Sequence, residues 1–272
     1  MAPAPGEVQW SLSQARTWLT RSSSATAAPP FAGAVALDAQ GASYREVVAL
    51  VSRGCAQSQE PAPARPTGVI WEADLDGDGS AERFFTGGCS AERYFVVLKH
   101  GPLQWAVWLS GAGLLVHVER RGSAIALISV TEGDGIERSR SLWLQQVDGQ
   151  NTTRQEFRAV GTQSASPTPA GELCVVERES KLRYEPRVRD APEDSGMGFE
   201  YPGNLLQVLA RGSRGYALGQ RAGWRWCAFA APAVPDEIEQ IARAMRTPAM
   251  LTLSPSPTTF ITGWLPERAV HR

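Results

Sequence analysis

The chain has 272 residues, of which 43% are hydrophobic, and its 27 lysines and arginines nearly balance 28 aspartates and glutamates. That length and composition are typical of a globular protein with one large or two modest cores. A formal net charge of −1 argues against nucleic acid or an anionic membrane surface as the main partner. The longest apolar stretch, residues 103–118, is too short and too interrupted to span a bilayer.

The N-terminus carries no visible export signal. Residues 1–6, Met-Ala-Pro-Ala-Pro-Gly, contain neither a basic nor an apolar segment. A methionine placed directly on an alanine- and proline-rich stretch would suit a mature chain from which a signal peptide had been removed. We therefore expect a periplasmic or otherwise exported protein, and a lipoprotein form stays open.

Two short helices are predicted in the first quarter of the chain. Apolar residues recur at helical spacing over 7–21 and again over 43–54. Residues 22–34, rich in serine, alanine and proline, predict a loop between them, and 57–67 predict a proline-containing linker.

The stretch that follows contains a motif typical of a metal ligand set. Asp74-Leu-Asp76-Gly-Asp78-Gly-Ser80-Ala-Glu82 places carboxylates at positions one, three, five and nine of a tight loop. Hard oxygen ligands gathered on one side of a turn are what Ca²⁺ requires. The predicted ligands are Asp74, Asp76, Asp78, the backbone carbonyl of Ser80, and Glu82.

The flanks of this loop distinguish it from an EF-hand. An EF-hand has a glutamate at position twelve and a helix on either side. Here position twelve is Phe85, and the flanks are rich in valine, isoleucine, tryptophan and phenylalanine, which favours strands.

Over residues 69–86 the chain resembles the D-x-D-G-D-G hairpin of VCBS/FG-GAP-type calcium repeats of secreted and envelope proteins. The resemblance implies a bound Ca²⁺ with a structural role. A metal-free turn is the alternative, because aspartate and glycine also make good turns. Repulsion between three crowded carboxylates favours a bound cation.

Short β runs separated by turn residues continue to about residue 160, and such a series predicts an antiparallel meander with the two helices laid against it. The predicted strands after the loop are 94–99, 105–109, 114–119, 124–130, 141–147 and 156–160. Residues 161–171, rich in serine, threonine and proline, predict a domain boundary. We expect a mainly β protein with a few short helices (α+β), divided into domains 1–165 and 166–272.

Residues 172–272 carry several motifs in a defined order. They are Val188-Arg-Asp-Ala-Pro192, Leu209-Ala-Arg-Gly212 with Leu218-Gly219, Gly223-Trp224-Arg-Trp226 and Gly263-Trp264-Leu265. In this order they resemble the bacterial SH3-like domain, which implies a small β-barrel. Arg187 stands where the family pattern has asparagine, and a helical insertion is predicted at 235–247.

Two tryptophans of these motifs, Trp224 and Trp264, are candidate binding residues. Aromatic side chains dominate binding hot spots, which supports that interpretation. The competing interpretation places them in the core and rim of a barrel too small to close on aliphatic side chains alone.

The four cysteines, Cys55, Cys89, Cys174 and Cys227, form no CxxC pair, and three scattered histidines do not complete a zinc site. An even count beside a calcium-type loop indicates disulfides in an oxidising compartment, with three connectivities open. We favour Cys55–Cys89 and Cys174–Cys227, one bridge in each half. Four unpaired thiols in a cytosolic protein are the alternative.

The sequence contains no recognised nucleophile, metalloprotease or phosphate-binding motif, so we do not expect an enzyme. We expect instead a protein partner, with the chain acting as an inhibitor or immunity protein that blocks a toxin or cell-wall hydrolase. The SH3-like resemblance implies peptidoglycan binding as an alternative. A third interpretation is an envelope hydrolase whose carboxylate pair would come from Glu82, Glu92, Glu119, Glu132 and Asp134.

Overall fold

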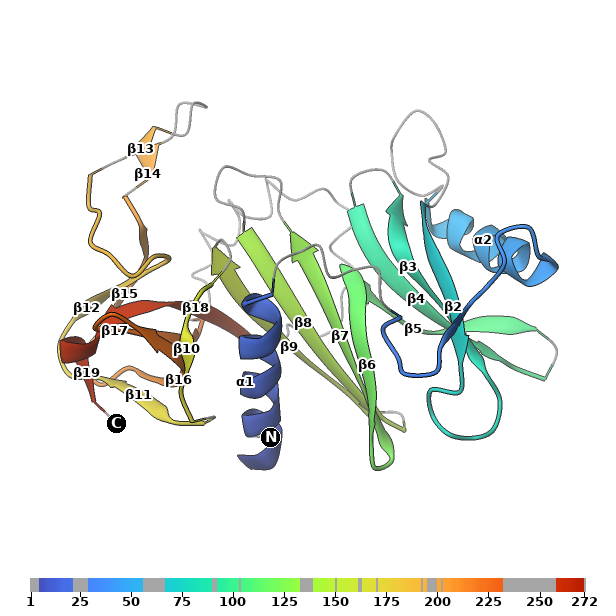
Figure 1. Cartoon of the computed structure of the whole chain (residues 1–272), viewed down its shortest axis with the longest axis horizontal. Coiled ribbons are helices and arrows are strands. Elements are labelled where there is room, and N and C mark those ends of the chain that lie inside the picture. Colours follow the sequence, from blue (N-terminus) through green and yellow to red (C-terminus); the bar gives the residue numbers. More distant parts are fainter. Residues whose placement is uncertain are drawn as a thin grey trace.

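In its described residues, the computed structural model consists mainly of β-strands, with two α-helices laid against them (Figure 1). The prediction of a mainly β protein is therefore confirmed. The structure describes residues 5–21, 29–55, 67–89, 92–102, 104–132, 139–149, 151–160, 163–169, 171–191, 193–194, 200–201, 203–231 and 258–271.

Both predicted helices are present, as α1 (Pro5–Leu19) and α2 (Ala42–Cys55). Each buries one apolar stripe: Leu12 and Leu19 of α1 and Val47 and Val51 of α2 are at most 4% exposed. No helix in the described ranges combines the length and the apolar character needed to cross a bilayer.

The first sheet is an antiparallel meander of five strands in sequence order, so each strand pairs with the next one along the chain. Its strands are β1 (Val35–Ala36), β2 (Thr67–Ala73), β3 (Glu82–Cys89), β4 (Glu92–His100) and β5 (Trp105–Ala112). One face of this sheet carries α2, whose Val47 and Val51 pack with Phe85 and Leu98.

The second sheet begins directly after Gly113 with four more antiparallel strands. They are β6 (Leu114–Arg121), β7 (Ala124–Glu132), β8 (Ser139–Asp148) and β9 (Asn151–Val160). Phe84 and Phe95 of the first sheet pack against Leu115 and Leu127 of the second. The opposite face of the second sheet packs against α1. The layers therefore run α2, first sheet, second sheet, α1 (Figure 1).

The remaining strands lie in the C-terminal part of the chain. They are β10 (Ser166–Pro167), β11 (Leu173–Val176), β12 (Ser180–Arg183), β13 (Glu193–Asp194), β14 (Glu200–Tyr201), β15 (Leu205–Leu209), β16 (Arg214–Arg221), β17 (Trp224–Ala230), β18 (Thr258–Pro266) and β19 (Val270–His271), with a short 3₁₀ helix, Glu267–Ala269, before the last. Except for the β13–β14 hairpin, these strands pair within one sheet. Among the described residues that sheet is not closed into a barrel, so the SH3-like barrel stays a prediction. The predicted helical insertion at 235–247 and Asp134 lie outside the described residues.

A parallel pairing joins the C-terminal strands to the meander. β18 pairs with β9, with Phe260 opposite Phe157, and these two rings stack with their centroids 4.8 Å apart. The second sheet therefore contains strands from both sides of residue 165, where the domain boundary was predicted. No local sequence pattern indicates this contact, because its two strands lie about a hundred residues apart. The division into domains 1–165 and 166–272 stays a prediction.

A disulfide fastens the C-terminal strands. Cys174 of β11 and Cys227 of β17 are bonded, with their Cα atoms 6.6 Å apart, across the intervening strand β16. This agrees with the predicted pairing. The side chains of Cys55 and Cys89 lie outside the described part of the chain, so the second predicted bridge stays a prediction.

Candidate metal centre

The predicted metal loop is the turn of the β2–β3 hairpin. Ala73 pairs with Glu82 at the base of the hairpin, so residues 74–81 form the turn. Leu75 is fully buried in the core between the two sheets. Because Leu75 points inward, its neighbours Asp74 and Asp76 are turned toward the outside.

Two glycines let the chain reverse within this loop. Gly77 and Gly79 have φ values of 85° and 86°, in the left-handed region that glycine adopts without a steric cost. At Gly77 a side chain would also collide with another residue, since a Cβ there would lie 2.6 Å from a guanidinium nitrogen of Arg120. The loop therefore requires glycine at position 77 for two independent reasons.

The loop carboxylates accept hydrogen bonds from the loop's own backbone. The N–H groups of Gly77 and Gly79 donate to Asp74 at 2.6 and 3.2 Å, and the N–H of Ser80 donates to Asp78 Oδ1 at 2.8 Å. The N–H of Asp78 donates to Asp76 Oδ1 at 3.2 Å. One oxygen from each of the three aspartates lies within 4.8 Å of the others, so the loop brings together the predicted aspartate ligands.

Glu82 adds a buried carboxylate to the cluster. Its side chain is 0% exposed, and its Oε2 accepts a hydrogen bond of 2.7 Å from the backbone N–H of Leu75. Within the described part of the chain, its Oε1 has no hydrogen-bond partner. Burial raises the pKa of this carboxyl above its usual range, because a charge is costly away from water. A buried carboxylate oxygen without a hydrogen bond indicates that a cation is needed beside it.

Lys99 of β4 is the cation closest to these carboxylates. Its Nζ donates to Asp76 Oδ2 and, at 2.8 Å, to Asp78 Oδ2, and it lies 3.7 Å from Glu82 Oε1. In each of these three carboxylates, the other oxygen is the one that accepts a hydrogen bond from the loop backbone. The two hydrogen bonds raise the pKa of Lys99, and the bond from Lys99 lowers the pKa of Asp78.

Arg120 of β6 joins the loop to the second sheet. Its guanidinium donates to the backbone carbonyls of Asp74, at 2.9 Å, and Leu75, at 3.2 Å. The same group lies 3.8 Å from Asp74 Oδ1. The loop is thus held from the inside by Leu75 and from the side by Arg120.

The charges of the cluster do not balance. Four carboxylates, Asp74, Asp76, Asp78 and Glu82, face the two cations Lys99 and Arg120, which leaves an excess of two negative charges. A divalent cation would remove that excess. The donor set consists of carboxylate oxygens, which hard cations prefer, so these residues could hold a metal ion.

Lys99 and Arg120 were not identified from the sequence. Both reach the loop through the pairing of distant strands. The β3–β4 register pairs Arg83 with Leu98, which places their neighbours Glu82 and Lys99 across from each other. Lys99 could have been identified by predicting the β3–β4 register correctly. Arg120 comes from the opposite sheet, so no pattern in the neighbouring sequence indicates it.

The two candidate binding tryptophans occupy different environments. Trp264 is 1% exposed, stacks on Trp226 with ring centroids 6.2 Å apart, and donates from Nε1 to Gln163 at 2.7 Å. Its burial supports the core interpretation over the binding one. Trp224, at the start of β17, is half-buried.

The carboxylates considered for catalysis are engaged in structural contacts where they are described. Glu119 accepts a hydrogen bond of 2.6 Å from Trp10 Nε1, and Glu132 forms an ion pair of 3.0 Å with Arg140. Glu82 lies beside the aspartates of the candidate metal centre. The side chain of Glu92 and the whole of Asp134 lie outside the described residues.

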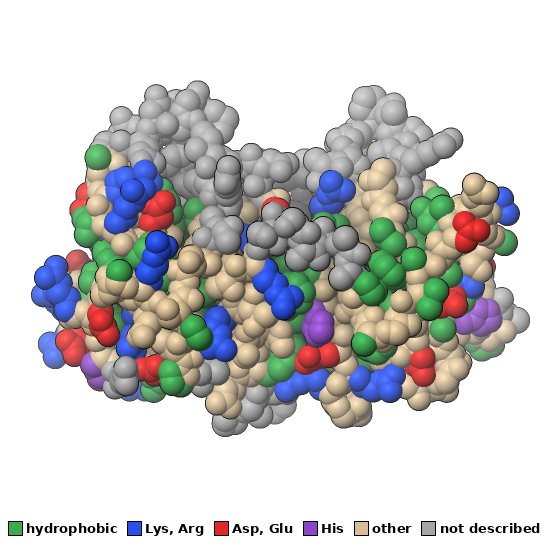
Figure 2. Space-filling model, in the orientation of Figure 1, with side chains coloured by type: hydrophobic (Ala, Val, Ile, Leu, Met, Phe, Trp, Pro, Cys, Tyr) green, Lys and Arg blue, Asp and Glu red, His purple; other side chains and the backbone are tan. Residues whose placement is uncertain are grey.

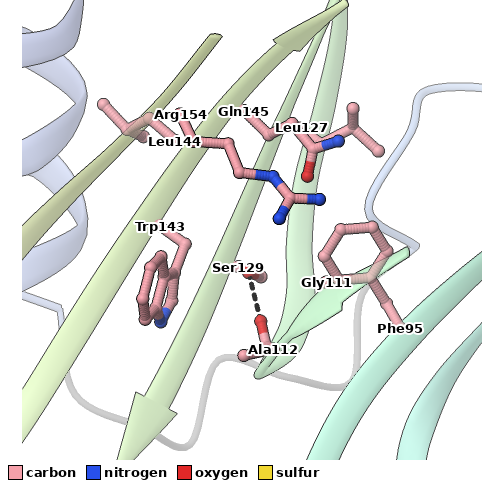
Figure 3. Close-up of a pocket in the computed structure, with 9 residues that line it drawn as sticks. All are labelled: Phe95, Gly111, Ala112, Leu127, Ser129, Trp143, Leu144, Gln145 and Arg154. Carbon is pink, nitrogen blue, oxygen red and sulfur yellow. Dashed lines mark hydrogen bonds between the residues drawn. The ribbon is translucent and has the colours of Figure 1, made fainter. Parts of the chain in front are cut away.

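A small pocket between the sheets is shown in Figure 3. Beside the pocket, the hydroxyl of Ser129 donates a hydrogen bond of 2.6 Å to the carbonyl of Ala112. Arg154 lines the pocket. The space of about 30 Å³ is enough for one or two water molecules. We assign no organic ligand to this pocket. Its lining consists of Phe95, Gly111, Ala112, Leu127, Ser129, Trp143, Leu144, Gln145 and Arg154.

No family model matches the chain, and neither a curated protein nor a solved structure shows significant similarity to it. The resemblances of residues 69–86 to calcium repeats and of 172–272 to SH3-like domains stay predictions. The candidate metal centre rests on its own geometry.

We predict that removing divalent cations destabilises the protein and that this effect depends on the loop. A ligand present at a hundred times its dissociation constant stabilises a fold by about 2.7 kcal/mol, which corresponds to roughly 5–10 °C in melting temperature. Differential scanning calorimetry with excess cation and with EDTA should show this difference in the wild type and lose it in Asp76→Ala. Asp190→Asn, which alters an exposed ion-paired aspartate far from the loop, should keep it. A wild-type melting curve that is the same in EDTA and in excess cation would contradict the site.

The buried carboxyl of Glu82 predicts a pH dependence in metal-free buffer. Because its pKa is raised in the folded chain, its stabilising contribution is present below the unfolded value of 4.5 and is lost as pH rises through the folded value. Urea unfolding in EDTA should therefore show the stability of the wild type, relative to Glu82→Gln, decreasing as pH rises from 4.5 into the neutral range. A difference that stays constant over this range would show that burial does not shift the pKa of Glu82.

Proposed function

We propose that the chain is an exported, calcium-stabilised, non-enzymatic binding protein of the cell envelope that acts on a protein partner. The observation that carries the metal part is the convergence of three carboxylate oxygens, from Asp76, Asp78 and Glu82, on one cation position, which the ammonium group of Lys99 occupies.

Calcium suits this loop better than magnesium. Ca²⁺ accepts six to eight oxygen ligands in flexible geometry, whereas Mg²⁺ requires a near-octahedral set and retains water. Four carboxylates and the carbonyl of Ser80, spread over nine residues of a hairpin turn, match the first description. The excess of two negative charges matches a divalent ion.

The disulfide supports export. Cys174 and Cys227 are bonded within the C-terminal core, and such bonds persist in oxidising compartments such as the periplasm. A structural Ca²⁺ site accords with the same location, because extracellular modules use calcium at its high external concentration.

The C-terminal strands support an SH3-like domain, although the described sheet is open. The turn between β16 and β17 consists of Ala222 and Gly223, both with positive φ, where the family motif has its glycine before tryptophan. Trp226 and Trp264 then fill the core, as a small barrel requires. We infer the domain from this agreement of motif and position.

A surface beside the metal loop has the composition of a protein interface. Among the described residues, β5 is the edge strand of the first sheet, and β4 is its neighbour there. Val107 is 61% exposed, and the half-buried Trp105 and Trp108 flank it. Arg83 lies 4.1 Å from the centre of the Trp105 ring. Aromatic residues and arginine are enriched in binding hot spots.

An extended segment of a partner protein fits this edge. The edge of β5 could offer backbone N–H and C=O groups to a further strand, apart from the carbonyls of Ser110 and Ala112, which already accept hydrogen bonds from Arg154 and Ser129. Exposed side chains would then select the partner. Charged side chains of both signs are interspersed on the coloured part of the face in Figure 2, which does not resemble a basic nucleic-acid surface. We infer that the partner is a secreted toxin or cell-wall hydrolase that the chain inhibits.

Affinity capture from an envelope fraction tests this function. With Ca²⁺ present, the wild type should retain a defined protein, and Val107→Glu should lower its recovery about 10-fold, as expected for loss of about 1.4 kcal/mol at a hot spot. Val208→Glu, which places the same charge on another exposed edge valine, should leave recovery unchanged. The activity of the captured toxin or hydrolase should fall when the wild type is added.

Three results would argue against the proposal. Equal capture by Val107→Glu would exclude the β5 edge as the partner surface. Sedimentation of the purified chain with sacculi in the absence of any protein partner would favour peptidoglycan binding. Hydrolysis of peptidoglycan by the purified chain would exclude a non-enzymatic role.

A further inference from the structure

The ammonium group of Lys99 lies at the position where a metal bound by this loop would sit. Three carboxylates each use one oxygen for a backbone N–H, and their other oxygens, Asp76 Oδ2, Asp78 Oδ2 and Glu82 Oε1, surround Nζ. A calcium ion bonded to the same oxygens at about 2.3–2.6 Å would come close to Nζ. Two cations at such a separation repel each other strongly, so they do not share these oxygens.

The side chain of Lys99 has a second position available to it, toward Trp108. Its side chain is 33% exposed, and its Nζ already lies 5.2 Å from the centre of the Trp108 ring. The β4–β5 register shifts at Trp108: Val97 pairs with Leu109 and Leu98 pairs with Val107. The resulting β-bulge places the Trp108 ring beside Lys99. An ammonium group over an indole face is attracted by it, and solvent is within reach.

We propose that Lys99 is a built-in competitor for the metal: its ammonium occupies the loop in the metal-free chain and moves out toward Trp108 when Ca²⁺ enters. This inference rests on the proposed calcium site. It explains how the buried carboxylate of Glu82 is tolerated without metal. It also implies a weaker calcium affinity than the four carboxylates alone would provide, because the metal must first displace an ion pair.

The lysine content of the chain makes the exchange directly measurable. The sequence contains two lysines, Lys99 and Lys181. Lys181 pairs with Asp190 in the C-terminal part of the chain, far from the loop, and is an internal control. Acetylation of wild-type protein under single-hit conditions, followed by peptide mass spectrometry, reports how accessible each ammonium group is.

Titration of the full chain with Ca²⁺ should raise the acetylation rate of Lys99 several-fold and leave that of Lys181 unchanged. The midpoint should match the dissociation constant from calorimetry. In calorimetry, Lys99→Met should bind Ca²⁺ about 5- to 30-fold more tightly than the wild type, as expected for removal of two partly exposed ion pairs. Lys181→Met should bind like the wild type.

The outcomes separate the exchange from the calcium site. Tighter binding by Lys99→Met would also follow from the loss of one positive charge, so the acetylation rate decides. Calcium binding with an unchanged or lower Lys99 rate would overturn the exchange and leave the site intact. Binding by Lys99→Met alone would show that the lysine excludes the metal, which supports competition and overturns the proposed calcium dependence of the wild type. No binding by either protein would overturn both.

Discussion

The structure around the metal loop depends on the compensation of one buried charge. Glu82 is enclosed at the base of the β2–β3 hairpin, where one oxygen is satisfied by the N–H of Leu75 and the other has no hydrogen bond. A buried carboxylate without a counterion costs several kcal/mol. The loop aspartates cannot help, since they add negative charge, so a cation must lie between Glu82, Asp76 and Asp78. Lys99 supplies one positive charge there, and a divalent ion would supply two.

The layered fold is what places these groups together. Leu75 anchors the loop in the core between the two sheets, and Arg120 reaches across from the second sheet to the loop carbonyls. Lys99 belongs to β4 and therefore connects the loop to the exposed edge strand β5, where Val107 and Trp108 lie. The loop and the surface proposed for the partner thus share strand β4 as a structural link. Calcium dependence of partner binding would follow from that connection.

Sequence periodicity predicted the helices, most strands and the aspartate loop, because each is encoded by neighbouring residues. The paired cysteines of the C-terminal half could also be predicted, since an even count and one pair in each half limited the choices. Lys99 and Arg120 escaped prediction because strand register and sheet packing bring them to the loop. The parallel β9–β18 pairing escaped for the same reason. For Trp264 the residue type alone left core and binding interpretations open, and only its burial distinguished them.

A crystal structure of the protein grown with Ca²⁺, with anomalous difference data, would show whether a metal occupies the loop. We predict one anomalous peak in the loop, bonded at about 2.3–2.6 Å to oxygens of Asp76, Asp78 and Glu82, with the ammonium group of Lys99 withdrawn from them. A loop in which Lys99 keeps both of its aspartate bonds at saturating Ca²⁺, with no anomalous peak, would contradict it.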